Sequence, residues 1–272
     1  MNTADNPEKP QEAAPLLEFA DVTVWQGDTR VLDSLSVTIQ EGENVAILGP
    51  NGAGKSSFVK TVLRELYPDP SAPGLIFRMR GKEVWDVFDL RSAIGVVSND
   101  LQFAYTRPVT GREVVISGFF SSIGLFNHIV TPEIERKADQ VLKFLEIEHL
   151  SDRLMSGMSS GESRRLLIGR ALVSNPATLI LDEPTNSLDI HALHTFRSTL
   201  RRIAGTGTGI ILITHNVHDI IPEISRVILM DHGRFIRDGR KGDVLTSSEI
   251  SRLFRVSVDV REDNGYYYLS GY

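Results

Sequence analysis

The sequence predicts an α/β protein with a mostly parallel sheet, a helical subdomain and an N-terminal antiparallel β subdomain. Five short apolar runs lie at residues 43–49, 92–98, 177–183, 209–215 and 226–231, with helix-like segments between them. Buried parallel strands are continuously apolar and need crossover connections, which are usually helices. Ahead of these runs, residues 16–25 and 31–39 alternate apolar and polar side chains, which is typical of half-buried antiparallel strands.

The remaining elements follow in order along the chain. Residues 56–66 repeat apolar side chains at helical spacing until PDPSAPG ends the pattern. Residues 106–150 are expected to be mostly helical, with Pro132 near the start of one helix, and a second helix over residues 159–176 ends at Pro176. We therefore place a helical subdomain at about residues 100–175. The alternating end of the chain, with its DNG turn, predicts a terminal hairpin.

These elements divide the chain into three parts. Residues 1–15 have three prolines and no apolar core, which indicates a disordered N-terminal tail rather than a secretory signal. Residues 16–244 form the main domain, and residues 245–272 hold a C-terminal helix and the hairpin.

Composition excludes several kinds of function. The chain has no cysteine, so disulfides, thiolate catalysis and cysteine metal sites are impossible. Its net charge of −6 argues against nucleic acid as a main partner. No apolar run approaches the ~18 residues of a membrane span. We expect a cytoplasmic protein, and any membrane crossing would belong to another chain.

The segment GPNGAGKSS at residues 49–57 carries the clearest chemical signal. It fits the pattern GxxxxGK[ST] with Gly49, Gly54, Lys55 and Ser56, and it lies between a predicted strand and a predicted helix. Glycines let backbone N–H groups surround a phosphate chain, and the following helix adds its positive dipole end. Lys55 can reach the β and γ phosphates, while the Ser56 hydroxyl is a ligand for Mg²⁺. A glycine-rich turn with a chance lysine is the alternative, and the flanking elements make it improbable.

Two other strand ends carry candidates for hydrolysis. Asp182 ends the run 177–183 and is expected to lie near Mg²⁺, and Glu183 follows it as a candidate base for the attacking water. His215 ends the next run and is expected to bond the γ-phosphate. Ligands of open α/β sheets bind at the carboxyl ends of strands, so these side chains are expected to meet. We interpret His191, His194 and His218 as solvated helix residues.

These residues, in this order, resemble the ATP-binding cassette (ABC) ATPases. The distinguishing segment is MSSGE at residues 158–162, which is similar to the family's LSGGQ signature and precedes LILDEPTNSLD at family-typical spacing. The resemblance covers residues 17–242. It implies the P-loop NTPase fold of the ABC ATPases, with ATP and Mg²⁺ as cofactors. It also implies a dimer, formed with a second copy or a related ABC subunit.

The resemblance assigns a role to each matching residue. Trp25 is placed to stack on adenine, although by itself it would be interpreted as a core or strand aromatic. Glu183, His215 and Lys55 are the catalytic set. Ser159 and Gly161 contact the γ-phosphate held by the other subunit, and Ser187, Leu188 and Asp189 form the interface loop. The phosphate-binding and metal-binding residues implied in this way are Gly49, Asn51, Gly52, Ala53, Gly54, Lys55, Ser56, Ser57 and Asp182.

The sequence departs from the family pattern at two places. A glutamine usually follows the strand at residues 92–98, as a sensor of Mg²⁺ and the transporter, but Asn99 stands there and Gln102 lies three residues on. Either residue can act, and we favour Gln102 as the ligand of nucleotide and metal. Ser160 replaces a usual signature glycine, which weakens the expectation of efficient hydrolysis.

The resemblance leads to two functional hypotheses. The first is the ATP-hydrolysing subunit of a transporter, located at the inner face of the membrane, with a separate transmembrane permease docked on residues 99–126. The C-terminal segment resembles importer ATPases for iron chelates, cobalamin and molybdate. The second is a soluble, non-transport ABC ATPase, a subgroup that SGFFSSIGLF (residues 117–126) resembles. A cassette that binds ATP without hydrolysis is a third option, which Glu183 and His215 oppose.

Overall fold

A mostly parallel sheet forms the centre of the protein. The structure is a computed structural model that describes residues 14–86, 93–186 and 188–271. Among these residues, six strands pair in the order β5-β6-β7-β3-β8-β9, and only β9 runs antiparallel to its neighbour. The strands are β3 (Asn44–Leu48), β5 (Ile94–Val97), β6 (Thr178–Asp182), β7 (Gly209–Thr214), β8 (Arg226–Asp231) and β9 (Arg234–Arg240). The predicted fold class is confirmed.

An antiparallel β subdomain covers one face of this sheet. Its strands β1 (Leu17–Gln26), β2 (Thr29–Ile39) and β4 (Ile76–Met79) pair in the order β2-β1-β4. Helix α1 (Lys55–Val62) lies beside them, and its buried Phe58 contacts Phe19 of β1 edge-to-face with ring centroids 5.9 Å apart. The apolar side chains of this subdomain and of one face of the main sheet form a single core cluster, which fixes α1 at the end of β3.

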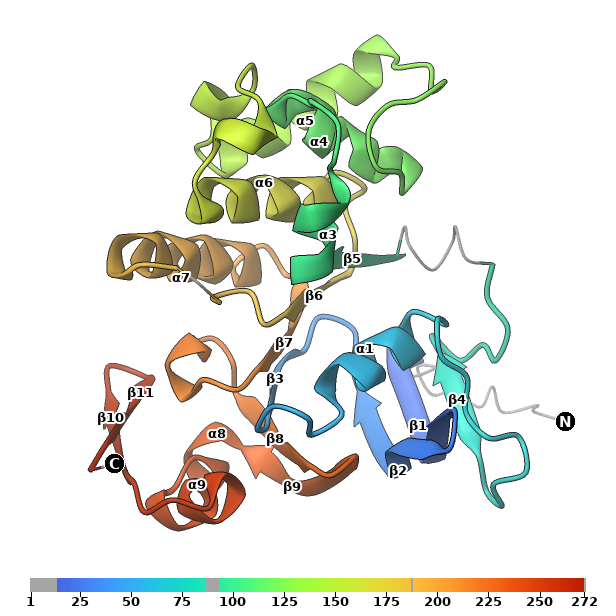
Figure 1. Cartoon of the computed structure of the whole chain (residues 1–272), viewed down its shortest axis with the longest axis vertical. Coiled ribbons are helices and arrows are strands. Elements are labelled where there is room, and N and C mark those ends of the chain that lie inside the picture. Colours follow the sequence, from blue (N-terminus) through green and yellow to red (C-terminus); the bar gives the residue numbers. More distant parts are fainter. Residues whose placement is uncertain (1–13, 87–92, 187, 272) are drawn as a thin grey trace, which may run out of the picture.

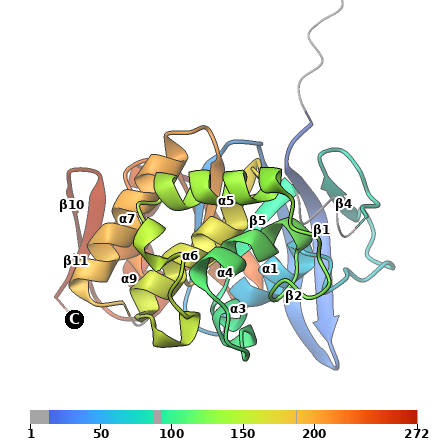
Figure 2. The same cartoon turned by 90° about the horizontal axis from the view of Figure 1, so that it is seen from above.

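A helical subdomain extends from the edge of the sheet at β5 (Figures 1 and 2). It contains α3 (Asn99–Ala104), α4 (Gly111–Ser117), η1 (Gly118–Phe120), α5 (Pro132–Phe144), η2 (Glu148–Leu150), η3 (Met155–Gly157) and α6 (Ser160–Leu172). Side-chain caps start its helices: Thr110 caps α4, Thr131 caps α5 with Pro132 in its first turn, and Ser159 caps α6. Within residues 106–150, which we expected to be mostly helical, residues 121–131 form a loop.

The remaining helices and the last two strands complete the domain. They are α7 (Ile190–Ala204), η4 (Val217–Asp219), α8 (Lys241–Val244), α9 (Ser247–Phe254), β10 (Asp259–Asp263) and β11 (Tyr266–Ser270). The last two strands form a hairpin whose turn residues, Asn264 and Gly265, have φ angles of 52° and 79°. Both values are positive, as a tight hairpin turn requires. In the described part of the chain, no helix is long and apolar enough to cross a bilayer.

Candidate nucleotide site

Three strands end side by side beneath the candidate site. Strand β7 pairs with β3 and with β6, so that Thr214 lies opposite Leu48, and Ile213 lies opposite Asp182. Backbone bonds extend this alignment past the strand ends: Gly49 N donates to Thr214 O at 3.2 Å, and Glu183 N donates to Ile213 O at 2.8 Å. The chain therefore leaves the sheet at the carboxyl ends of these three strands, where the phosphate loop, Glu183 and His215 begin next to one another.

Two glycines of the phosphate loop are required by close packing. A Cβ on Gly49 would lie 2.2 Å from Met230 O, which no side chain could tolerate. Gly54 has φ 101° and caps α1, and a Cβ there would lie 2.8 Å from Val31 O. The loop thus follows a path that only glycine permits, with α1 beginning at Lys55 directly behind it. Such a loop leads its backbone N–H groups toward a bound anion.

Lys55 is the cation at the centre of the site. Only 4% of its side chain is exposed, and its Nζ donates to Gly49 O and Pro50 O at 2.9 Å each. The same ammonium lies 3.1 Å from Glu183 Oε1. These three contacts hold the positive charge inside the loop, where a phosphate chain would run.

Glu183 is held in a strained backbone conformation with three polar neighbours. Its φ is 48°, in the left-handed region that non-glycine residues rarely adopt. Oε1 lies near Lys55 and 3.3 Å from His215 Nδ1, while Oε2 accepts from Asn186 Nδ2 at 2.9 Å. Burial raises the pKa of Glu183, but Asn186, Lys55 and His215 together outweigh it and lower the net pKa. Glu183 is therefore a carboxylate at neutral pH.

Asp182 has the features of a metal ligand. Its carboxylate lies near the Ser56 hydroxyl, which acts to lower the pKa of Asp182, yet its Oδ1 is buried with no hydrogen-bond partner among the described residues. Burial and then the Glu183 charge raise the pKa of Asp182. An orphaned carboxylate oxygen beside a serine hydroxyl matches the hard oxygen ligands that Mg²⁺ takes in phosphate-loop proteins. The residues present fit nucleotide with Mg²⁺.

Replacing Asp182 with Asn should stabilise the metal-free protein. The raised pKa means that the folded state favours protonated Asp182, so stability falls as the pH rises through the folded pKa and the charge destabilises the fold at pH 7. We expect Asp182→Asn to raise the Tm in EDTA by about 2–4 °C, the shift that 1 kcal/mol produces in a domain of this size. Thermal unfolding with and without Mg²⁺ measures it. A Tm of Asp182→Asn that is equal to or below that of the wild type at pH 7 would contradict the electrostatic explanation. So would a Tm difference between the two proteins that is the same at pH 5 as at pH 7.

A pocket of about 670 Å³ opens over the phosphate loop. Asn51, Gly52, Gly54, Lys55, Ser56, Ser57 and Glu183, all predicted from the sequence, line it. Ala53 is buried beneath and binds Gly233 N through its carbonyl at 2.8 Å. Sequence reasoning missed six lining residues, which are Thr29, Arg30, Val31, Asp33, His232 and Gly233. No local motif marks them, because they come from β2 and from the β8–β9 turn.

Trp25 lies near this pocket without lining it. It stands at the end of β1 with 48% of its surface exposed, so it is not a core residue. The guanidinium of Arg30, a pocket residue, lies 5.9 Å from the centre of its ring. Arg30 therefore lies between the exposed ring of Trp25 and the pocket.

The signature residues occupy a different part of the chain. Ser159 caps α6 in a capping box with Glu162, and Gly161 lies in the first turn. Asp189 caps α7, its Oδ1 accepting from Ala192 N at 2.7 Å. None of the described residues lining the pocket comes from these two helix starts. The side chains of Asn99 and Gln102, and Ser187 as a whole, lie outside the described part of the structure.

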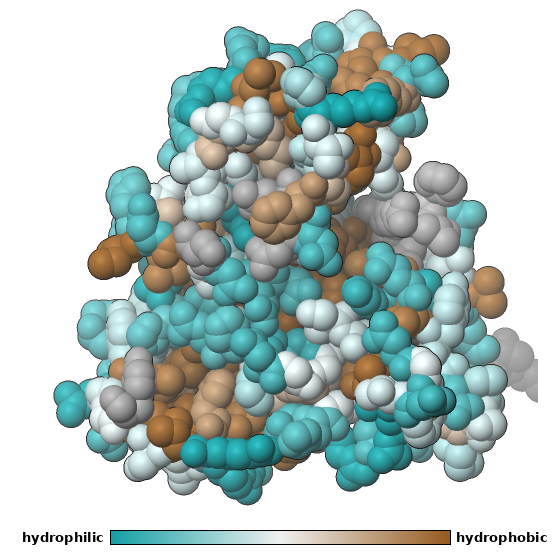
Figure 3. Space-filling model, in the orientation of Figure 1, coloured by the Kyte–Doolittle hydropathy of each residue, from teal (hydrophilic) through white to brown (hydrophobic). Residues whose placement is uncertain are grey.

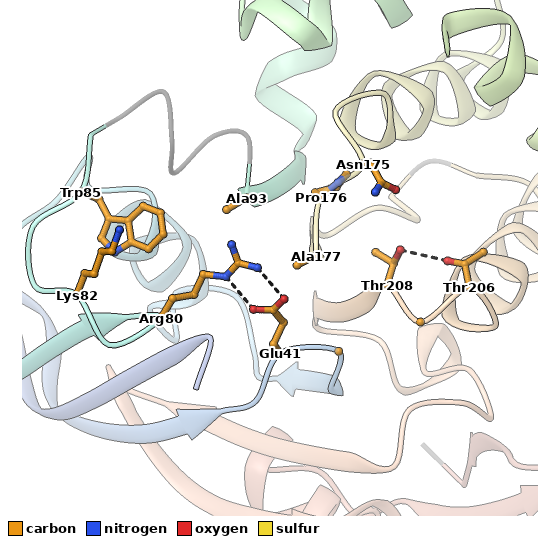
Figure 4. A pocket seen from close by; sticks show the side chains of 12 residues that line it. Glu41, Arg80, Lys82, Trp85, Ala93, Asn175, Pro176, Ala177, Thr206 and Thr208 are labelled. Carbon is orange, nitrogen blue, oxygen red and sulfur yellow. Dashed lines mark hydrogen bonds and ion pairs between the residues drawn. The ribbon is translucent and has the colours of Figure 1, made fainter. Parts of the chain in front are cut away.

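A larger pocket lies elsewhere and lacks this chemistry. It measures about 790 Å³ and is drawn in Figure 4. Four of its polar residues are paired with one another: Arg80 binds Glu41 through two nitrogens, at 2.8 and 2.6 Å, and Thr206 bonds Thr208. The phosphate-loop pocket, where Lys55 and Glu183 meet, is the functional candidate despite its smaller volume.

The interpretation of His218 as a solvated helix residue is wrong. His218 is half-buried in the short turn η4, and its Nε2 accepts a hydrogen bond from Leu269 N of the terminal hairpin at 3.3 Å. Burial and then Arg197 lower its pKa. A local sequence pattern cannot reveal this contact, because its partner lies 51 residues away.

The fold and site define a phosphate-loop nucleotide-binding protein, and comparisons with known proteins identify its family. The ABC transporter model matches residues 32–186. The Nod factor export ATP-binding protein I of Sinorhizobium fredii is 35% identical, over 88% of this chain and 67% of that protein. The cell division ATP-binding protein FtsE of Streptococcus pneumoniae is 32% identical, over 84% of this chain and 97% of that protein. Among solved structures, the chain aligns with cbiO1 of Clostridium perfringens, which is part of the ABC transporter complex cbiONQ. The TM-score is 0.73 and the sequence identity 29%, over 88% of this chain and 94% of cbiO1.

The chain belongs to the ABC transporter family. It is an ATP-binding subunit of this family and an ATPase, as the resemblance in the sequence implied.

Proposed function

We propose that the protein binds MgATP in the phosphate-loop pocket and hydrolyses it to drive a separate membrane permease. The observation that carries this proposal is the convergence of Lys55, Glu183 and His215, with Glu183 Oε1 within 3.3 Å of both other side chains. Backbone groups of residues 49–57 would hold the phosphates, and Ser56 and Asp182 would hold Mg²⁺, which would supply positive charge beside the transferred phosphoryl group.

In this proposal the residues act on water and phosphate in one displacement. Glu183 orients the water and accepts its proton as the water oxygen bonds to the γ-phosphorus. The bond from that phosphorus to the bridging oxygen breaks, giving ADP and phosphate. Lys55 and His215 stabilise the phosphate charge. A phosphate in the loop would replace Glu183 as the partner of Lys55, leaving the carboxylate to the water.

The remaining roles concern recognition of the base and of a second subunit. Trp25 offers an exposed aromatic face for adenine, and Gln102 is proposed as the sensor that meets nucleotide and metal. Ser159 and Gly161 would bind the γ-phosphate held by a partner cassette, because they lie outside the pocket of their own chain. Asp189 then lies in the interface. We propose a homodimer, or a pair with a related cassette, that closes on two ATP molecules.

Exposed apolar side chains on the helical subdomain support a membrane partner. Phe103, Ile123, Phe126 and Ile129 are 77%, 38%, 56% and 84% exposed, and a hollow of about 250 Å³ lies between Tyr105 and Phe126. Figure 3 shows apolar surface over this subdomain. Tyr105, Phe119, Phe120 and Leu125 instead pack partly against the core. Clustered exposed apolar surface is typical of interaction sites, which supports the proposal that the protein works at the inner face of the membrane, bound to a permease.

The decisive experiment is a pull-down of tagged Glu183→Gln protein from detergent-solubilised host membranes with MgATP. We expect a multi-span membrane protein in near-stoichiometric amount, and its identity would indicate the solute. The same protein with MgADP is the control, since the closed dimer requires ATP. Recovery of a soluble homodimer alone, absent from the membrane fraction, would instead support the soluble ABC ATPase.

A further inference from the structure

The terminal hairpin packs on the loop that follows β7, the same loop that begins with the candidate catalytic residue His215. In Figure 1 strands β10 and β11 lie next to this loop, and Figure 2 shows them alongside α7. Leu269 N donates to His218 Nε2 at 3.3 Å, and the rings of Tyr268 and His218 are 5.4 Å apart. The strand contacts the loop through backbone and side chain together.

The turn of the hairpin is fastened to the same loop. Lys241 Nζ donates to Ile221 O, Pro222 O and Gly265 O, at 3.3, 3.1 and 3.0 Å. Gly265 approaches Pro222 so closely that a Cβ would lie 2.9 Å from Pro222 Cβ. One ammonium therefore joins the hairpin turn to the end of the loop, so the hairpin is docked at two points.

The loop between these two points is held together by its own hydrogen bonds, so a displacement at one residue is expected to displace its neighbours. Thr214 Oγ1 donates to the buried carboxylate of Asp219 at 2.5 Å, and Asp219 N donates to Asn216 O at 3.1 Å. His218 N donates to Asn216 Oδ1 at 3.1 Å. His215 lies inside this bonded unit, so a shift of His218 moves the backbone that carries His215.

A third element meets the hairpin at His218. Arg197 of α7 donates through Nη2 to His218 O, and its guanidinium lies 5.2 Å from the Tyr266 ring. Because α7 starts at the Asp189 cap, Arg197 links His218 to a helix that begins at the proposed dimer interface. The neutral imidazole is the form that accepts from Leu269 N, and burial and then Arg197 favour it by lowering the pKa of His218.

We infer that His218 is a positioning residue, through which the C-terminal hairpin holds the His215 loop in place for ATP hydrolysis. The inference rests on the proposed role of His215. No described hairpin residue lines the nucleotide pocket, so the effect acts on turnover rather than on binding. Catalytic groups tolerate little displacement, and a shift of about 1 Å can cost ~10²-fold in rate. Loss of the single contact between His218 and Leu269 should lower the rate by less than this factor.

The test compares His218→Ala with His218→Gln, whose amide oxygen can reach the place of Nε2 and accept from Leu269 N. We expect His218→Ala to lower kcat for ATP by about 3- to 30-fold, within that limit, with the ATP Kd changed less than about twofold. His218→Gln should recover most of the rate. His149→Ala, at an exposed histidine of η2, is the matched control and should match the wild type.

Amide hydrogen exchange of residues 214–220 provides a readout that does not depend on catalysis. It should be faster in His218→Ala than in the wild type and the His149→Ala control. Unchanged exchange in His218→Ala would overturn the inference, and so would equal rate losses in the Ala and Gln variants. Absence of ATPase activity in the unsubstituted protein would overturn the proposed function instead. The wild type is assayed first, so this outcome is seen before any variant is compared with it.

Discussion

Glu183→Gln is expected to lower the rate of ATP hydrolysis by about 10²- to 10⁴-fold, the usual effect of losing a general base. The substituted amide keeps the size of the side chain and can still accept from Asn186 Nδ2, which donates at 2.9 Å in the unsubstituted protein. It cannot accept a proton from water at neutral pH. ATP binding should persist because the phosphate loop is unchanged, so the variant should accumulate as an ATP-bound dimer.

Steady-state turnover, nucleotide affinity and gel filtration together measure this outcome. Glu135→Gln, at an exposed carboxylate of α5, is the matched control and should retain full turnover. Turnover of Glu183→Gln within a few-fold of the wild type would remove Glu183 from the role of base. Loss of ATP binding in the same variant would indicate that Glu183 mainly supports the phosphate loop.

The central sheet was predictable because its strands are buried on both faces. Strands β6 and β7 are continuous apolar runs, and their interiors are fully buried. Strands β4 and β9 were not predicted. The segment Arg234–Arg240 carries four charged residues and is largely exposed, as an edge strand that pairs only with β8 can be. Its strand conformation depends on that partner rather than on its own pattern.

The site was predictable where one short motif supplies its geometry, and unpredictable where distant segments meet. Lys55, Asp182 and Glu183 follow from spacing and from their places at strand ends. The sequence does not show that Lys55 is bonded to Glu183, or that Asn186 fixes the other carboxylate oxygen. Arg30 and His232 reach the pocket through β2 and the β8–β9 turn. Those contacts require the packed antiparallel subdomain, which periodicity alone cannot place.

Lys55→Ala is expected to weaken ATP binding by about 10- to 150-fold, since a hydrogen bond to a charged group contributes about 1.5–3 kcal/mol. The effect has two parts in this site. The ammonium that would meet the phosphates is lost, and Glu183, which lies 3.1 Å from that ammonium, becomes an uncompensated anion facing the same phosphates. Titration with a fluorescent ATP analogue measures the affinity. Lys60→Ala, at an exposed lysine of the same helix, is the control.

The two parts can be separated by combining both substitutions. If repulsion from Glu183 contributes, the double variant Lys55→Ala, Glu183→Gln should bind ATP more tightly than Lys55→Ala alone, because the second change removes the anion. Equal affinities would assign the whole effect to the lost contact between lysine and phosphate. A Lys55→Ala variant that binds ATP as well as the Lys60→Ala control would contradict the phosphate-loop assignment itself. The double variant thus tests the Lys55–Glu183 ion pair, which the sequence motif alone does not predict.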